Sequence, residues 1–121
     1  MKCTLMYSGP DGRSHFADLE IPSASEIIAA PTIRFTETTG GRTNNFHPAP
    51  RRYLILFLGG VEEMECGDGS VRRFQAGDIL LCDDTTGQGH LTRDLEDCRR
   101  VFITMPDGFD PNAWHIEGAG G

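Results

Sequence analysis

Two stretches decide the fold that this sequence predicts, Gly41-x5-His47-x-Ala49-x3-Tyr53-x6-Gly60 and Gly87-x2-His90-x3-Asp94. The first ends in the strongest apolar run of the chain, residues 51–58, which Gly59-Gly60 terminates. A short apolar run bounded by turn residues is typical of a strand buried on both faces. The sequence therefore predicts a central strand at 51–58, with one histidine ahead of it and a second in a distant part of the chain.

The two stretches resemble the two motifs of the cupin superfamily, G-x5-H-x-H-x3/4-E-x6-G and G-x5-P-x-G-x2-H-x3-N. The first and last histidines of the pattern are present as His47 and His90, whereas Ala49 and Tyr53 replace the second histidine and the glutamate. The segment from Gly77 to Gly87 is longer than the family spacing and is similar to one in small single-domain bacterial cupins. The resemblance implies an all-β cupin jelly-roll β-barrel with at most one or two short helical turns.

The rest of the chain agrees with an all-β reading. Alternating or β-branched runs separated by glycine, proline or aspartate turns predict further strands. Ser23-x-x-Glu26 has the spacing of a capping box, which predicts one helical turn before Pro31. The predicted strands lie at residues 2–7, 14–21, 32–38, 61–66, 71–74, 79–82, 90–92 and 99–105.

Length favours a single domain over residues 1–121, since 121 residues suffice for one packed core, and the resemblance implies that it is a cupin domain. We expect N-terminal strands and a loop over 1–40, the two motifs within 41–105, and a tail at 106–121. Trp114 is expected to dock on an apolar surface, and the glycine-rich end is expected to be loose.

Charge and cysteine content limit the classes of partner and compartment. A net charge of −7 disfavours nucleic acid, because phosphate binding needs a positive field. The sequence shows no leader pattern and no apolar run long enough for a bilayer, so a cytoplasmic location without membrane contact is the expectation. The four cysteines lack metal-site spacing and are expected to be free thiols.

Strand alternation predicts which side chains enter the barrel. If the first motif is extended throughout, His47, Arg51, Tyr53 and Phe57 share its inner face. The opposite face then carries a row of leucines (Leu54, Leu56 and Leu58), which we expect an N-terminal strand or a second subunit to cover, and a homodimer is predicted. In the second motif Gln88, His90 and Thr92 are expected to point inward together.

One functional hypothesis is a metal site. His47 and His90 supply imidazole ligands suited to iron, nickel, manganese or zinc, and His15, Asp83 or Asp84 would supply a third. A divalent transition metal in this position would suit an oxygenase.

A second hypothesis is metal-free acid–base chemistry on a small molecule, of lyase, isomerase or cyclase type. His47 or His90 would move the proton, Arg51 would bind an anionic oxygen and Tyr53 would donate a hydrogen bond. Further substrate contacts are expected from Gln88, Thr92, Asp84 and Phe57. A third hypothesis, a non-catalytic binding or sensing module, stays open because a fold alone never establishes catalysis.

Overall fold

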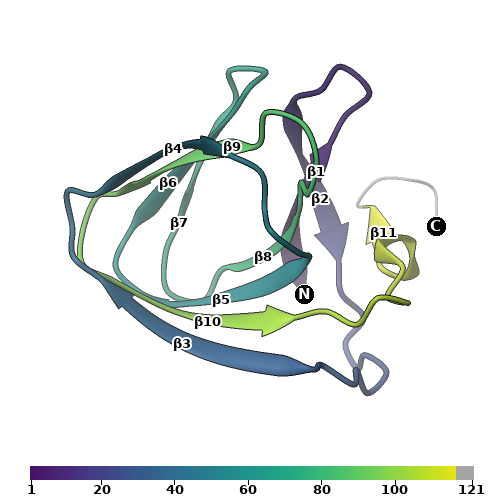
Figure 1. The fold of residues 1–121 in the computed structure, drawn as a ribbon. Coiled ribbons are helices and arrows are strands. Elements are labelled where there is room, and N and C mark those ends of the chain that lie inside the picture. Colours follow the sequence, from purple (N-terminus) through teal and green to yellow (C-terminus); the bar gives the residue numbers. More distant parts are fainter. Residues whose placement is uncertain (117–121) are drawn as a thin grey trace.

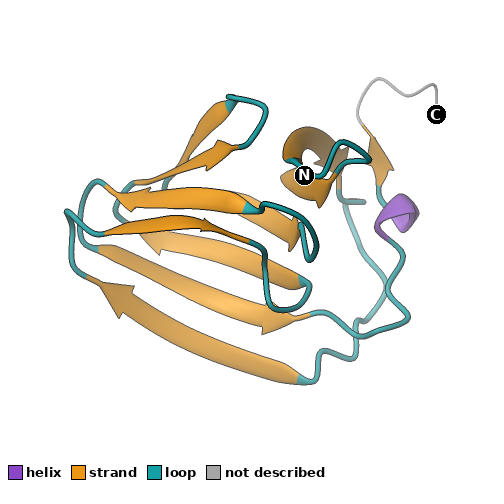
Figure 2. Cartoon of the chain, turned by 45° about the horizontal axis from the view of Figure 1, so that its top comes forward, coloured by secondary structure: helices purple, strands orange, loops and turns teal. Residues whose placement is uncertain are grey.

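The computed structural model describes residues 1–116, the side chains of Asn112, His115 and Ile116 excepted. The expectation of a loose end at 117–121 therefore lies outside the described residues. The described part consists of strands joined by turns and loops, plus one turn of 3-10 helix (Figures 1 and 2). In chain order they are β1 Lys2–Ser8, β2 Ser14–Glu20, β3 Thr32–Thr38, β4 Thr43–His47, β5 Tyr53–Gly59, β6 Glu62–Cys66, β7 Val71–Phe74, β8 Ile79–Asp83, β9 His90–Asp94, β10 Cys98–Thr104, η1 Pro111–Ala113 and β11 His115–Ile116.

The pairing of strands β3 to β10 is nested. β3 pairs with β10, β4 with β9, β5 with β8 and β6 with β7, and all four pairs are antiparallel. These pairs form two sheets, in the orders β3-β10-β5-β8 and β4-β9-β6-β7, so the chain behaves as one long hairpin wound into a double layer. This is the topology of a jelly roll, which confirms the predicted cupin fold.

The N-terminal strands extend the first of these sheets to seven strands. β1 pairs in parallel with β8, β2 pairs with β1, and β11 closes that edge. Among the described residues, no helix is long and apolar enough to cross a membrane.

Apolar side chains form two clusters, one on each face of the larger sheet. The cluster between the sheets includes Met6, Phe57, Met64 and Phe74. The cluster on the outer face includes Leu19 and Leu81 and is covered by the segment that carries Trp114. Trp114 is 5% exposed and packs edge-on against Phe109, which confirms its predicted docking.

Two local predictions about the chain are wrong. The capping-box spacing after Ser23 produces no helical turn, since residues 21–31 are irregular and Ile27 is fully exposed. Without burial of an apolar face, so short a helix has nothing to offset its nucleation cost. The central strand begins at Tyr53 rather than residue 51, because Pro48 and Pro50 interrupt the extended backbone before it.

Candidate functional site

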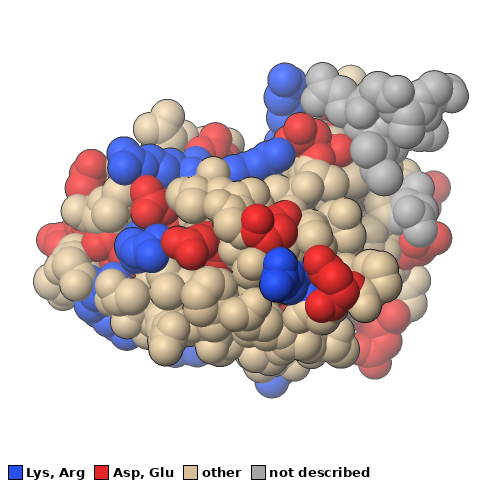
Figure 3. Space-filling view, turned by 90° about the horizontal axis from the view of Figure 1, so that it is seen from above, with Lys and Arg blue, Asp and Glu red and all other residues tan. Residues whose placement is uncertain are grey.

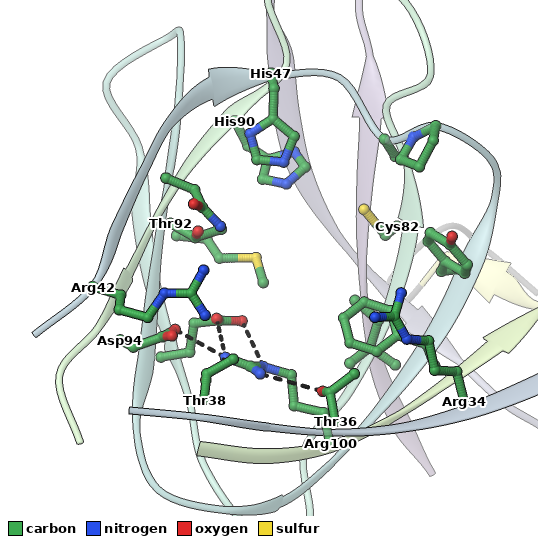
Figure 4. A pocket seen from close by; sticks show the side chains of 18 residues that line it. Arg34, Thr36, Thr38, Arg42, His47, Cys82, His90, Thr92, Asp94 and Arg100 are labelled. Atoms are coloured by element: carbon green, nitrogen blue, oxygen red, sulfur yellow. Dashed lines mark hydrogen bonds and ion pairs between the residues drawn. The ribbon is translucent and has the colours of Figure 1, made fainter. Parts of the chain in front are cut away.

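A cavity of about 300 Å³ lies between the two sheets. Its walls come from strands β3, β4, β5, β6, β8, β9 and β10, so every strand of the nested core except β7 contributes. Figure 4 shows that His47 and His90 lie together at one end, whereas Arg100, Asp94, Thr36 and Thr38 lie at the other. The two ends have different chemistry and are described in turn.

The histidine end presents two imidazoles side by side. The ring centroids of His47 and His90 are 4.8 Å apart. His47 Nδ1 lies 2.8 Å from the backbone carbonyl oxygen of Asn45, which only accepts, so this nitrogen carries the proton. His90 Nδ1 lies 2.6 Å from Asp84 Oδ2. With both Nδ1 atoms engaged as donors, the Nε2 atom of each ring is left to act on a ligand.

Asp84 is the anchor behind His90. It is fully buried, and Oδ2 accepts hydrogen bonds from His90 and from the Ser14 hydroxyl at 2.6 Å. Oδ1 accepts from the Cys82 thiol at 3.3 Å. Burial, together with the neighbouring Asp84 charge, raises the pKa of Cys82 well above its ordinary value, so this thiol stays protonated. The carboxylate is therefore committed to orienting its neighbours rather than to contacting a ligand.

A bulge in β4 aims His47 into the cavity. Asn44 and His47 are three residues apart, so a regular strand would point them to opposite faces. The register between β4 and β9 shifts between these two residues, and both line the cavity. Bulges are used in this way to re-aim side chains near active sites.

The opposite end of the cavity holds a buried arginine between two carboxyl groups. Arg100 donates to Glu62 Oε2 at 2.6 Å and to Asp94 Oδ1 at 2.9 Å, and the Thr38 hydroxyl accepts at 3.0 Å. All three charged side chains are about 5% exposed. Arg100 thus has its Nε and Nη2 donors engaged within the protein, while Nη1 contacts the Thr36 hydroxyl at 3.5 Å, and the side chain serves the fold of this end.

The two carboxyl groups titrate in opposite directions. Burial and the hydrogen bond to Asp94 raise the pKa of Glu62 to about 8, against the pull of Arg100. Burial alone would raise the pKa of Asp94, but hydrogen bonds with Glu62 and Thr38 and the Arg100 charge outweigh it and lower that pKa. At neutral pH Glu62 is therefore a neutral acid that shares its proton with the Asp94 carboxylate.

Two further arginines line the cavity, and their surroundings differ from those of Arg100. Arg34 on β3 and Arg42 in the β3–β4 turn project from opposite walls (Figure 4). Neither side chain makes an ion pair or hydrogen bond with any residue that the structure describes. They differ in this from Arg52, Arg72, Arg73, Arg93 and Arg100, each of which pairs with a carboxylate.

Four of the residues expected at the site line this one cavity: His47, His90, Tyr53 and Thr92. Phe57 does not line it and lies in the core cluster, stacked on Phe74 with ring centroids 5.1 Å apart. Sequence reasoning thus located the histidine end.

The other expected residues lie elsewhere. Arg51 follows the break at Pro50 and lines a separate depression outside the barrel. Gln88 is exposed, and its side chain lies against Gly67. His15 pairs with Asp11 and Asp68, each at 2.9 Å, and Asp83 pairs with Arg52 at 2.7 Å. None of these four lines the cavity with the histidine pair.

Sequence reasoning missed the charged end of the cavity: Arg34, Arg42, Arg100, Glu62 and Asp94. A partial signal existed on β3, where Arg34, Thr36 and Thr38 alternate with Ile33, Phe35 and Glu37. In an isolated strand that polar face reads as the solvent side. Only the pairing of β3 with β10 places it inside.

The residues fit a metal in part. Each histidine has its Nδ1 hydrogen-bonded, as metal-bound histidines do, which leaves Nε2 as the ligand atom. Cys82, Asp84 and His90 also bring ligand-type atoms within 4.8 Å of one another. At that cluster, however, Asp84 already accepts three hydrogen bonds, so a metal would displace them. The two Nε2 atoms are the better candidate ligands.

Comparison with known proteins supports the fold alone. No family model and no curated protein matches the sequence. A conserved protein of unknown function from Streptococcus pyogenes superposes with a TM-score of 0.50 at 17% identity, over 63% of this chain and 65% of that one, less than two thirds of its length. A protein from Neisseria meningitidis gives a TM-score of 0.50 at 12% identity, over 85% of this chain and 82% of that one.

A third solved structure is an uncharacterized conserved protein with a double-stranded beta-helix domain from Klebsiella pneumoniae, with a TM-score of 0.49 at 16% identity. The superposition covers 79% of this chain and 89% of that one.

Proposed function

We propose that this protein is a small-molecule enzyme whose chemistry is proton transfer at His47 and His90, of lyase, isomerase or cyclase type. One observation carries the proposal: two imidazoles lie side by side in a cavity, and each has its Nδ1 engaged and its Nε2 available. A pair of this kind can remove a proton at one atom of a ligand and return one at another.

The two histidines differ in a way that assigns their roles. His90 is buried against the Asp84 carboxylate, which stabilises the imidazolium that forms when Nε2 takes a proton. His47 is exposed, and its Nδ1 donates to a neutral carbonyl. His90 is therefore the base, and His47, in exchange with solvent, is the acid. Tyr53 lines the same cavity, and its hydroxyl would supply a hydrogen bond to a ligand oxygen.

The proposal is tested by proton exchange in D2O, which reveals proton transfer whatever product forms. A panel of small hydroxy and keto compounds is incubated with the protein, and deuterium entry at carbon is followed by proton NMR. We expect exchange or turnover in at least one compound, with a rate reduced about 100-fold or more by His90→Asn. Val71→Asp, on the exposed side of β7, is the control and should keep the parent rate. Equal rates in the parent, His47→Asn and His90→Asn would refute the acid–base assignment.

A metal-dependent enzyme is the second candidate, favoured by the two oriented Nε2 atoms. A metal held there would act as a Lewis acid or redox centre, and His47 and His90 would hold it. Elemental analysis of protein purified without chelator decides between the candidates. Near-stoichiometric iron, nickel, manganese or zinc that is lost in His47→Ala and His90→Ala would replace the metal-free proposal. Ligand binding without turnover, in metal-free and metal-loaded protein alike, would leave a binding module.

A further inference from the structure

The charge of the cavity differs in sign from that of the whole chain. The chain carries a net charge of −7. At the charged end, Arg100 (+1), Asp94 (−1) and the neutral Glu62 (0) sum to zero at neutral pH. Arg34 and Arg42 therefore leave the cavity lining positive by two charges. A positive pocket in an acidic protein concentrates anions and repels cations.

Arg34 and Arg42 also have unused hydrogen-bonding capacity. A guanidinium group presents five N–H donors in a planar fork that matches the oxygens of carboxylate and phosphate groups. The arginines that stabilise this fold use their donors on acidic side chains, as Arg100 and Arg93 do. Arg34 and Arg42 have no such partner among the described residues, although both line the cavity.

We infer that the small molecule bound between the sheets carries an oxyanion, a carboxylate or phosphate group, that Arg34 and Arg42 attract from opposite walls of the cavity. The inference rests on the proposed function in taking this cavity as the ligand site. The volume of about 300 Å³ lies at the lower end of the range for small-molecule pockets, roughly 300–1,000 Å³. The ligand is thus a short organic acid or phosphate rather than a nucleotide, with its reacting part held toward Nε2 of His47 and His90.

Calorimetric titration at low ionic strength tests the anchor. The probes are malonate, succinate and inorganic phosphate, with malonamide as an uncharged analogue. We expect saturable binding of at least one anion, weakened about tenfold or more by Arg34→Gln and by Arg42→Gln, and partly restored by Arg34→Lys. The control is Arg13→Gln, which removes the same charge from an exposed arginine outside the cavity and should leave binding unchanged.

Each alternative outcome is decisive. If carboxylates bind and phosphate does not, the anchor takes a carboxylate. If phosphate binds and carboxylates do not, it takes a phosphate group. The inference is overturned if malonamide binds as tightly as malonate, if Arg13→Gln weakens binding as much as Arg34→Gln, or if no anion binds. Anion binding by the parent protein without any proton exchange would refute the proposed chemistry but not the anchor. Proton exchange on an uncharged compound, with no anion bound, would refute the anchor but not the proposed chemistry.

Discussion

Glu62 is the residue whose ionisation should be visible in the stability of the whole protein. Its pKa in the folded state is about 8, above the ordinary 4.5, so folding favours its protonated form. Below pH 4.5 the protonated side chain contributes its full stability, and this contribution is lost as the pH rises through 8. Glu62→Gln mimics the protonated acid at every pH and removes this dependence.

Urea unfolding of the parent and of Glu62→Gln, at about pH 5 and about pH 8, measures the effect. We expect the free energy of unfolding of the parent, relative to the variant, to fall by on the order of 2 kcal/mol across this window. Groups common to both proteins cancel in the difference. The same difference at both pH values would show that Glu62 is ionised throughout.

At the scale of single residues, the sequence located the histidines but not their chemical partners. His47 and His90 stand in recognisable spacings, whereas Glu62 and Arg100 are 38 positions apart and meet through two different sheets. Asp84 was expected to touch the substrate, yet its three hydrogen bonds hold His90, Ser14 and Cys82. Local patterns report the face that a side chain takes, and its partners depend on the pairing of distant strands.

Among the elements, the β8–β9 loop connects Asp84 to His90 and contacts the segment that carries His47 and Ala49. The backbone carbonyl of Asp84, in this loop, accepts a hydrogen bond from Ala49 N at 2.9 Å. The backbone N–H of Gln88 donates a hydrogen bond to Gly12 O. Gly89, at the end of the loop, has φ of 77°. A Cβ built on Gly89 would lie 2.0 Å from the backbone carbon and oxygen of His47. The glycine before His90 therefore allows β4 and the loop to approach closely.

Gly89→Ala should therefore be costly. We expect a loss of about 3 kcal/mol or more in the free energy of unfolding, since both the positive φ and a backbone clash oppose the methyl group. Gly69→Ala is the matched control, because Gly69 has φ of 89° but open space around its Cβ position. That variant should lose only about 1–2 kcal/mol. Equal losses in the two variants would argue against close packing at Gly89.

Strands were easier to predict than the places where they break. The range 32–38 was predicted to the residue, since its alternation and β-branched side chains leave one interpretation. The break at Pro48 and Pro50 moved the start of β5 to Tyr53 and took Arg51 out of the cavity. Strand periodicity holds only while the backbone stays extended, so each predicted face is valid only up to the next proline or bulge.

At the scale of the whole molecule, charge is distributed unevenly. Basic and acidic side chains lie interspersed on the face shown in Figure 3. Arg93 pairs with Glu63 and Glu65 across β9 and β6, whose outward side chains form the surface of the smaller sheet. The outer face of the larger sheet at β3 is instead apolar, with Phe35 75%, Ile33 62% and Leu58 49% exposed.

We propose that a second copy of the chain covers this apolar face. Of the predicted leucine row, Leu54 packs into the outer cluster, whereas Leu58 remains exposed beside Phe35. Glu37 and Arg99 are paired in register at the border of the patch, so a two-fold contact can match opposite charges. Phe35→Asp should halve the mass measured by light scattering, and Val71→Asp, on the other sheet, should not. A parent protein that is monomeric in the same measurement would contradict this proposal.

The central claim concerns two nitrogen atoms, and nitrogen-15 NMR of the imidazole rings tests it most directly. The neutral rings of His47 and His90 should both carry their proton on Nδ1, because Nδ1 donates to Asn45 O in one and to Asp84 in the other. Asp84→Asn should change the proton position in His90 and leave that in His47 unaltered. A neutral His90 in the parent with its proton on Nε2 would contradict the account, because that nitrogen could then neither accept a proton nor bind a metal.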